Sequence, residues 1–495
     1  MRAVGIDVGT SSTKVVLAEI VDGRVREVAT RAAATPRDVR SLLEVVEAGC
    51  RSLMADGGDV QAVGVASMAE TGAPIGADGD ALTELLRWDE GLGASDAGEL
   101  QDLAPEVFAR SGVRLSAKTP LMTWRWLRRA RPEIWDLMAC WLGAADLVVH
   151  GLTGERVTDH TLAGRTGGYR LAAPGRATPT AFDVSLLSLA GMARDRLPRV
   201  AGADEIAGRL SAAAAARTGL PAGLPVVVAG HDHQVAAWAA GTRSPRDVAD
   251  SLGTAEAVLT VLARRPDPEQ VRRQGMSLVR TAAGDADAVV AGSSSAGAML
   301  QDWLSRIPAA EHKAVLAAAA DELAADDQPT GAAVAPYLRG RQSPEPDPEA
   351  RAGRPPAGWT RQRQARAVVE GICYQARWMI ESQPAQEVPQ RVAVIAGSRL
   401  PALWTALKTA TLPWPVALVR AAEPVATGAA VLALARSGAL GAPADAVRTA
   451  PALDAETPAP PGRDLHAEAC AAFVRSVRAA LPAPDGSSGR SAAVD

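Results

Sequence analysis

The chain has 495 residues, of which 47% are hydrophobic and 22% charged, which is typical of a globular protein with two or more domains. The formal net charge of −4 argues against a nucleic-acid-binding protein, because there is no broad basic excess to meet phosphate. It does not argue against a bound nucleotide, which needs only local positive groups and a metal ion.

The cysteines and the apolar runs exclude further classes. The four cysteines are far apart and form no CxxC pair, so we expect neither a disulfide framework nor a zinc site, and a reducing cytoplasm fits. The first residues enter a strand without the apolar h-region of a signal peptide. No run approaches ~20 apolar residues, so we expect no membrane span.

Residues 4–17 form the first informative motif. An apolar run ends in Asp7, a Gly-Thr-Ser-Ser-Thr turn follows, and Lys14 opens a second apolar run, so the pattern predicts strand, tight turn and strand. Gly9 permits φ > 0 and a close approach of the backbone to a ligand. Successive N–H groups in such a turn can form an anion-binding concavity, with hydroxyls and Lys14 as further donors. The turn residues expected to bind phosphate are Gly9, Thr10, Ser11 and Ser12.

Asp7 stands at the strand end beside this turn. A carboxylate there suits a Mg²⁺ ion that is carried on substrate phosphates. The alternative for the whole stretch is an ordinary hairpin, since a short motif has a real rate of false matches.

The following segments predict an α/β domain with a mixed sheet. Asp22-Gly23 is a tight-turn signal leading to a strand near 24–28. Pro36 opens a predicted helix whose apolar residues recur at helical spacing, and residues 60–65 form a further predicted strand. The order strand, strand, strand, helix, strand is typical of such a domain. Residues 66–72 follow a strand end, where ligands tend to bind.

Residues 119–141 interleave tryptophans with arginines. Such a mixture can indicate a surface for single-stranded nucleic acid. We interpret it as a core stripe with a solvated arginine face, given the acidic chain as a whole.

A short buried strand at 226–229 leads into Gly230-His231-Asp232-His233. An acid just past a strand-end glycine, with a histidine on either side, is a good catalytic candidate. Metal binding by this trio is an alternative, although it lacks the third spaced ligand of a zinc site. A structural role for each histidine stays open.

Residues 250–261 repeat the pattern of a Gly-Thr turn feeding an apolar strand, after a predicted hinge at 241–246. Gly253 and Thr254 would place N–H and hydroxyl donors on phosphates. Two such turns predict two similar domains facing one nucleotide. The small-residue loop at 292–297 precedes a helix and can either hold an anion or allow tight packing.

The chain resembles the FGGY carbohydrate kinases, within the actin-like, ribonuclease-H-like ATPase group. The two turns look like the family's two phosphate motifs, Asp232 matches the acid of its Gly-(Gly/His)-Asp, and residues 336–344 and 368–376 resemble later family segments. The strings around 230–233 and 251–256 look nearest to a fuculokinase-like or xylulokinase-like branch. The resemblance implies an α/β fold of two actin-like domains, 1–243 and 244–440, with a nucleotide and sugar cleft between them and an extension over 441–495.

The resemblance also implies roles. Asp232 would be the general base for phosphorylation of a hydroxyl of a small sugar or polyol, with ATP and Mg²⁺ as cofactors and domain closure to exclude water. The adenosine site would contain Gly297, Gly397 and Ser398. The sugar site would contain Met68, Ala69, Glu70, Trp88, Asp89, His231 and His233.

Several residues depart from the family pattern. Ser67 and Ala69 replace its Gln and His, and Glu70 is added, with a solvated loop acid as the alternative for Glu70. Trp88 and Asp89 are adjacent and lack the usual arginine, and packing at the core edge is the alternative for Trp88. Ala396 stands where the family usually has one of the two or three glycines that lie against adenosine.

These departures favour one alternative from another class, an actin-like nucleotide-binding regulatory protein without kinase activity. The retained Asp232 argues against it, since a pure binder needs no base. The sequence leaves open which sugar is used and whether the chain forms a homodimer. Residues 464–481 predict a terminal helix, and 482–495 a disordered tail.

Overall fold

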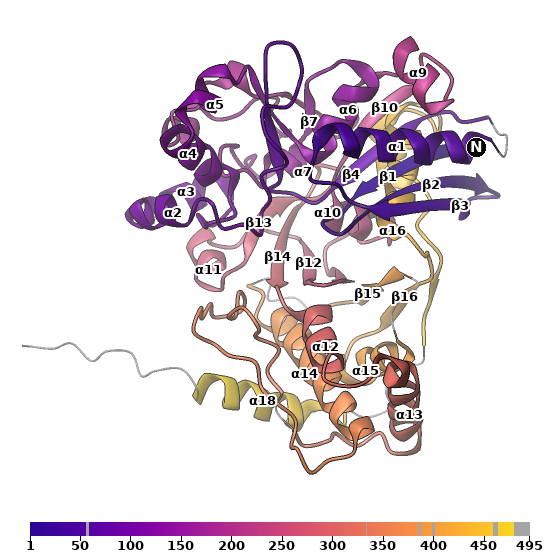
Figure 1. Cartoon of the computed structure of the whole chain (residues 1–495). Coiled ribbons are helices and arrows are strands. Elements are labelled where there is room, and N and C mark those ends of the chain that lie inside the picture. Colours follow the sequence, from indigo (N-terminus) through magenta and orange to yellow (C-terminus); the bar gives the residue numbers. More distant parts are fainter. Residues whose placement is uncertain (56–58, 333, 385–387, 398–400, 459–463, 480–495) are drawn as a thin grey trace, which may run out of the picture.

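The computed structural model describes residues 1–55, 59–332, 334–384, 388–397, 401–458 and 464–479. Its amino-terminal half is built on a six-stranded mixed sheet in the order β3-β2-β1-β4-β10-β9 (Figure 1). β1 pairs antiparallel with β2 and parallel with β4, which is parallel to β10. The strands are β1 (Arg2–Val8), β2 (Ser12–Val21), β3 (Arg24–Ala34), β4 (Val63–Ser67), β9 (Gly208–Arg209) and β10 (Pro225–His231).

Two helices from distant parts of the chain pack on one face of this sheet. They are α10 (Asp232–Ala239) and α16 (Pro424–Arg436), the latter yellow in Figure 1. Gly5 and Gly64 make the contact with α16 possible, because a Cβ at either would lie about 2 Å from a backbone oxygen of that helix, 1.8 Å and 2.0 Å respectively. α16 therefore belongs in space with the first sheet, although in sequence it follows the second. The predicted limits of the domains remain predictions.

The opposite face and the rim of the first sheet carry the other amino-terminal elements. α1 (Val39–Met54) buries its apolar stripe on the sheet, as its spacing predicts. It begins at Val39 rather than at Pro36, because the Asp38 side chain caps it by accepting from Ser41 N–H. The others are β5 (Gly72–Ile75), α2 (Ala94–Glu99), α3 (Ala104–Ser111), α4 (Pro120–Ala130), α5 (Pro132–Leu137), β6 (Cys140–Gly143), α6 (Ala144–Thr153), β7 (Val157–Asp159), α7 (His160–Ala163), α8 (Val184–Ser188), β8 (Arg199–Ala201) and α9 (Ala212–Thr218).

The segment that mixes tryptophans with arginines is a packed core, as predicted. Trp124, Leu127 and Trp135 are buried in one hydrophobic cluster, whereas Arg128 and Arg129 of the same stretch are exposed or partly exposed. The apolar face of α4 thus explains the aromatic residues without a nucleic acid.

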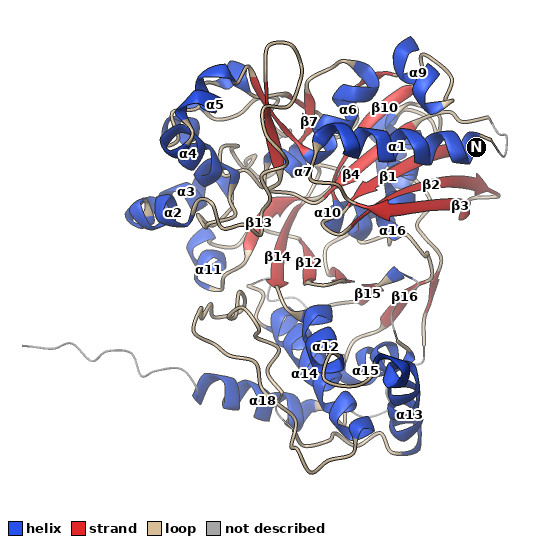
Figure 2. Cartoon of the chain, viewed as in Figure 1, coloured by secondary structure: helices blue, strands red, loops and turns tan. Residues whose placement is uncertain are grey.

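The carboxyl-terminal half is built on a seven-stranded sheet in the order β13-β14-β12-β11-β15-β16-β17, with helices against it (Figure 2). Its strands are β11 (Asp247–Leu252), β12 (Glu256–Leu262), β13 (Ser277–Arg280), β14 (Asp287–Ser293), β15 (Arg391–Ile395), β16 (Val416–Val419) and β17 (Ala455–Glu456). Its helices are α11 (Pro268–Arg273), α12 (Ala296–Leu304), α13 (His312–Ala325), α14 (Arg361–Glu381), α15 (Ala402–Thr411) and α18 (Ala467–Ala479). α17 (Pro443–Thr449) instead packs on α16, in the core that includes the first sheet. Two α/β domains, each with a strand-turn-strand hairpin at its start, are therefore confirmed.

α10 ties the two sheets together. Val235 and Trp238 pack with the first sheet and α16, whereas Ala236, Ala237 and Ala240 pack against strands of the second sheet. The amino-terminal end of α10, which carries Asp232, is thereby fixed between the domains. None of the described helices is both long and apolar enough to cross a membrane. The predicted tail at 482–495 lies outside the described residues.

Candidate functional site

The first turn joins β1 and β2 and places two charged residues opposite each other. Asp7 and Lys14 are paired in the strand register, and Lys14 Nζ lies 3.6 Å from Asp7 Oδ2. The same ammonium lies 2.7 Å from Oε2 of Glu423, the residue before α16. Burial raises the pKa of Asp7 to about 7, against the opposing charge of Lys14 and with the nearby Asp232 adding to the rise. Asp7 Oδ1 is buried without a hydrogen-bond partner.

The glycine of this turn is required for a different reason from the one expected. Gly9 does not have a positive φ, so the left-handed conformation is not its role. A Cβ there would lie 2.9 Å from the backbone oxygen of Ser12, which accepts the Gly9 N–H at 3.1 Å. Space inside the turn, rather than backbone handedness, therefore selects glycine. Ser11 is exposed at the tip of this turn.

The hydroxyl of Thr10 connects the first turn to the predicted sugar-site residues. Trp88 Nε1 donates to Thr10 Oγ1 at 3.1 Å, and this hydroxyl lies 3.4 Å from Met68 Sδ. Trp88 also packs against the core of the first domain, which supports the packing alternative, and a contact of Trp88 with sugar remains a prediction. Asp89 points elsewhere, because its carboxylate is paired with Arg87 at 3.0 Å.

Glu70 is a paired acid rather than the solvated loop acid that we kept as an alternative. Its φ is +58°, and its carboxylate accepts from Arg165 Nε at 2.9 Å and Nη2 at 2.6 Å. Both side chains are about one-tenth exposed. Burial would raise the pKa of Glu70, but the charges of Arg165 and Lys118 outweigh it and lower the pKa. Neither Arg165 nor Lys118 was identified from the sequence.

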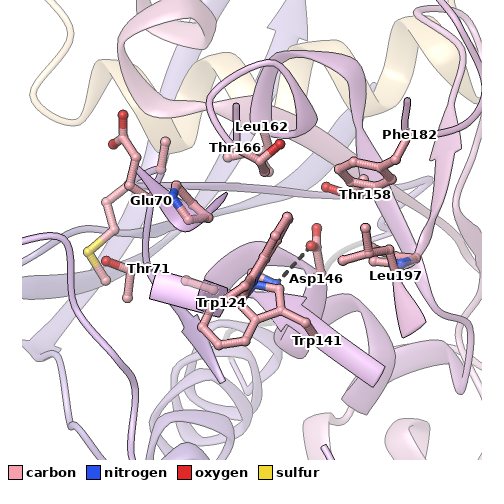
Figure 3. A pocket seen from close by; sticks show the side chains of 16 residues that line it. Glu70, Thr71, Trp124, Trp141, Asp146, Thr158, Leu162, Thr166, Phe182 and Leu197 are labelled. Atoms are coloured by element: carbon pink, nitrogen blue, oxygen red, sulfur yellow. Dashed lines mark hydrogen bonds between the residues drawn. The ribbon is translucent and has the colours of Figure 1, made fainter. Parts of the chain in front are cut away.

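The loop that carries Met68, Ala69 and Glu70 also lines a small cavity of about 30 Å³, room for a few water molecules (Figure 3). Trp124 and Trp141 form its floor, and the Glu70 carboxylate points away from them. The cavity therefore lies behind the loop, on the side away from the Glu70–Arg165 pair.

Asp232 directly follows β10, whose last residues form an irregular strand end. Gly230 adopts φ +128°, where a Cβ would lie 2.4 Å from Thr161 Oγ1, and the register of β10 shifts at this point. Thr161 Oγ1 accepts the His231 N–H at 2.8 Å. Asp232 is then the first residue of α10, with its carboxylate at the positive end of the helix.

The two histidines hold the Asp232 carboxylate. His231 Nε2 lies 3.1 Å from Asp232 Oδ1, and the His233 N–H donates to the same oxygen at 2.6 Å. Burial would raise the pKa of Asp232, but the histidine charges and these hydrogen bonds outweigh it and hold the pKa well below its usual range. Asp232 is therefore ionised at neutral pH. Ligand atoms of the three residues lie within 4.8 Å of one another, so the metal-binding alternative is geometrically possible.

His233 also reaches the second domain. Its Nδ1 lies 3.2 Å from Ser251 Oγ in β11, just before the second turn. Gly253 and Thr254 are exposed at the tip of that turn, as expected for residues that contact a ligand. Beneath them, Lys408 of α15 is fully buried and contacts Asp250 Oδ2 at 2.6 Å and Glu256 Oε1 at 2.5 Å. Sequence reasoning missed this lysine.

The predicted adenosine residues are only partly described. Gly397 follows β15 with φ +62°, and a Cβ there would lie 2.8 Å from Ala422 O. Ser398 lies outside the described residues. The Gly297 N–H donates to Gly253 O at 3.0 Å, and a Cβ on Gly297 would lie 2.3 Å from that oxygen. Tight packing therefore explains the small-residue loop, and an adenosine role for Gly297 remains a prediction.

Comparison with known proteins identifies the family. Residues 2–239 match the model of the FGGY family of carbohydrate kinases, N-terminal domain, and residues 248–437 match that of its C-terminal domain. The L-fuculokinase of Escherichia coli is 31% identical over 202 residues, 40% of this chain and 41% of that protein. The autoinducer-2 kinase of Klebsiella pneumoniae is 29% identical over 219 residues, 43% of this chain and 39% of that protein. The chain thus spans about two fifths of the length of the curated relatives it matches.

Solved structures agree over nearly the whole fold. The xylulose kinase of Rhodospirillum rubrum superposes with a TM-score of 0.80 at 24% identity, covering 97% of this chain and 98% of that one. Plasmodium falciparum glycerol kinase also gives 0.80, at 16% identity, covering 98% and 99%. At these identities the likeness establishes the two-domain fold alone. Together with the two family models, it shows that the chain belongs to the FGGY family of carbohydrate kinases.

Proposed function

We propose that the chain transfers the γ-phosphoryl group of ATP, with Mg²⁺, to a hydroxyl of a small sugar or polyol, and that Asp232 is the general base. The observation that carries the proposal is the position of Asp232. It is an ionised carboxylate at the start of α10, held by His231 and His233 and close enough to Asp7 to raise the pKa of Asp7.

Asp232 can remove the hydroxyl proton. In phosphoryl transfer the protein mainly positions the reactants, stabilises charge and supplies a proton acceptor. The alcohol becomes more acidic as its oxygen bonds to phosphorus, so a carboxylate of low pKa is a sufficient base. The two contacts to Asp232 Oδ1 leave the other oxygen of the carboxylate to accept the proton.

Asp7 fits the metal role. It is buried, one of its oxygens lacks a hydrogen-bond partner, and burial has raised its pKa, all of which a bound cation would relieve. Mg²⁺ bound there would neutralise charge on the phosphates. The two exposed turn tips, Ser11 and Gly253-Thr254, would supply N–H and hydroxyl donors to the phosphates, with Lys14 adding charge.

The names of the relatives support the proposed acceptor class. The curated matches are named L-fuculokinase and autoinducer-2 kinase, which supports a small polyhydroxylated acceptor such as a ketopentose or deoxyketohexose. We also propose a reducing, cytoplasmic location, supported by four cysteines that are all free and buried. A homodimer remains open.

The test is ADP release with ATP and Mg²⁺ across ketopentoses, deoxyketohexoses, polyols and aldonates. Asp232→Ala should lower kcat by about 10²- to 10⁴-fold, the usual contribution of a general base. Asp136→Ala, an exposed carboxylate on α5, is the matched control and should turn over normally. Full turnover in Asp232→Ala would remove the proposed base. If the wild type released no ADP with any acceptor but still bound ATP by calorimetry, a nucleotide-binding regulatory protein would be favoured.

A further inference from the structure

Lys118 has no direct ion-pair partner among the described residues, and the carboxylate whose charge reaches it, Glu70, is paired with Arg165. Lys118 lies in the loop before α4, is half-buried, and forms no ion pair or hydrogen bond with any described residue. Its contact is with the face of Trp88, whose ring centre is 5.8 Å from Nζ. Burial lowers the pKa of Lys118, against the opposing charge of Glu70.

The neighbourhood of Lys118 has an excess of positive charge. Arg114 is half-buried and likewise forms no ion pair with the described residues, and it lies close enough to lower the pKa of Lys118 further. Arg165 is close as well, but Glu70 neutralises it. Three cations against one carboxylate leave two positive charges unbalanced. Half-buried cations are normally paired, because their desolvation is otherwise uncompensated.

This cluster adjoins the proposed reaction site. Glu70 and Arg165 both act on the pKa of His233, the neighbour of Asp232. Trp88, which lies under Lys118, donates to Thr10 of the first phosphate turn. Lys118 is therefore connected through Trp88 to the first phosphate turn, and its neighbours Glu70 and Arg165 are close to the histidine beside the proposed base.

The two ends of the proposed site have opposite charge. At the reacting end, Asp7, Asp232 and Glu423 outnumber Lys14, and the excess of negative charge suits Mg²⁺. At the acceptor end, Glu70 is the one carboxylate that acts on Lys118, and it is already paired with Arg165, so two positive charges are in excess. A neutral sugar would leave those two charges desolvated and uncompensated.

We propose that the acceptor carries an anionic group, a carboxylate or a phosphate ester, at the end away from the reacting hydroxyl, and that Lys118 with Arg114 binds this group. The proposal rests on the proposed kinase function and replaces the neutral ketopentose or deoxyketohexose given there with an acidic sugar. The Trp88 ring would hold the lysine stem, and Arg165 would stay with Glu70. The phosphoryl transfer itself is unchanged.

The experiment compares acid and neutral acceptors of matched length: pentonates with pentitols, hexonates with hexitols, and pentose 5-phosphates as the phosphate arm. The wild type should use one anionic class with a kcat/KM at least about 10- to 100-fold above its neutral partner, the usual range for a close charge pair. Lys118→Met should remove that preference mainly through KM, and Lys118→Arg should retain it. Lys313→Met, an exposed lysine on α13, should behave as wild type.

Two results would overturn the proposal. One is a wild type that uses neutral acceptors as well as acidic ones; the other is an equal loss on both classes in a folded Lys118→Met variant. Calorimetric binding of the same acids separates this proposal from the kinase itself. If nothing is phosphorylated, acids that bind the wild type but not Lys118→Met still support the anion site, whereas acids that bind neither, or both equally, refute it.

Discussion

The two phosphate-turn hairpins, β1–β2 and β11–β12, have the same backbone plan but place their charges differently. Each is an antiparallel pair inside its sheet with an acid in the first strand, Asp7 in one and Asp250 in the other. In the first hairpin the lysine comes from the hairpin itself, and its side chain is 23% exposed. In the second, Lys408 comes from α15, over 150 residues away in sequence, and is fully buried.

The same motif can therefore bind a ligand in one domain and stabilise the fold in the other. The first hairpin keeps a carboxylate oxygen without a partner beside a partly exposed ammonium, which is an arrangement open to a ligand. In the second, Lys408 closes over both Asp250 and Glu256. Burial raises the pKa of Glu256, and the Asp250 charge adds to this, whereas the Lys408 charge opposes it.

Removing the buried lysine should give the largest effect. Lys408→Met leaves two carboxylates without their counter-charge inside the second domain, so we expect a loss of about 3–5 kcal/mol in the free energy of unfolding. Urea denaturation, with hydrogen exchange of the β12 amides, measures it. The exposed Lys313→Met is the control, and a loss of less than about 1 kcal/mol for Lys408→Met would show that the buried cluster is dispensable.

Removing the lysine of the first hairpin should act on activity instead. Lys14→Met takes away a positive group beside the proposed phosphates, so kcat/KM for ATP should fall by about 10²- to 10³-fold. The free energy of unfolding should change by less than about 1 kcal/mol, because the side chain is partly exposed. Lys408→Met should thus change mainly the free energy of unfolding, and Lys14→Met mainly kcat/KM for ATP. If both variants lowered the free energy of unfolding equally, the two hairpins would not differ in role.

Alanine substitutions of the two turn glycines should have smaller effects, and these effects should differ between the two turns. A methyl group on Gly9 would lie 2.9 Å from a backbone oxygen, whereas one on Gly253 would meet its nearest atom at 3.6 Å, and neither has a positive φ. Gly9→Ala should therefore strain the first turn by about 1–3 kcal/mol. We expect calorimetry to show this strain as roughly 10-fold weaker ATP binding. Gly253→Ala should bind ATP within about 2-fold of wild type. Equal losses would mean that both turns need glycine for ligand approach.

The sequence predicted what depends on local pattern. Both hairpins, the position of Asp232 and the core face of α4 follow from spacing over a few residues. The reason for Gly9 was misassigned, because a φ angle cannot be read from one glycine. Lys408, Arg165 and Glu423 were missed because their partners lie far away in sequence, and only the fold brings them together. The scarcity of lysine was the available signal: of four lysines in the chain, only Lys313 is exposed.

The smallest expected effect concerns pH, and it separates the hairpins by their response to metal. A carboxyl whose pKa is raised on folding stabilises the fold below its ordinary pKa and loses that contribution as the pH rises through the raised value. Without metal, both Asp7, raised to about 7, and Glu256 should therefore make the fold less stable between about pH 5 and pH 8. Mg²⁺ should remove the Asp7 part, because the ion stabilises the ionised carboxylate.

Glu256→Gln should remove the pH dependence of stability that Glu256 contributes, since the amide mimics the protonated acid at every pH. Urea midpoints from pH 5 to pH 8 for the wild type, Asp7→Asn and Glu256→Gln, each with and without Mg²⁺, give the comparison. Asp146, whose pKa burial also raises to about 7, contributes the same slope in every sample. We therefore expect Mg²⁺ to reduce the slope for Glu256→Gln and to leave that for Asp7→Asn unchanged. Equal slopes for the wild type and Glu256→Gln in the absence of metal would mean that the second hairpin holds no titrating proton, and that its three buried charges are balanced in another way.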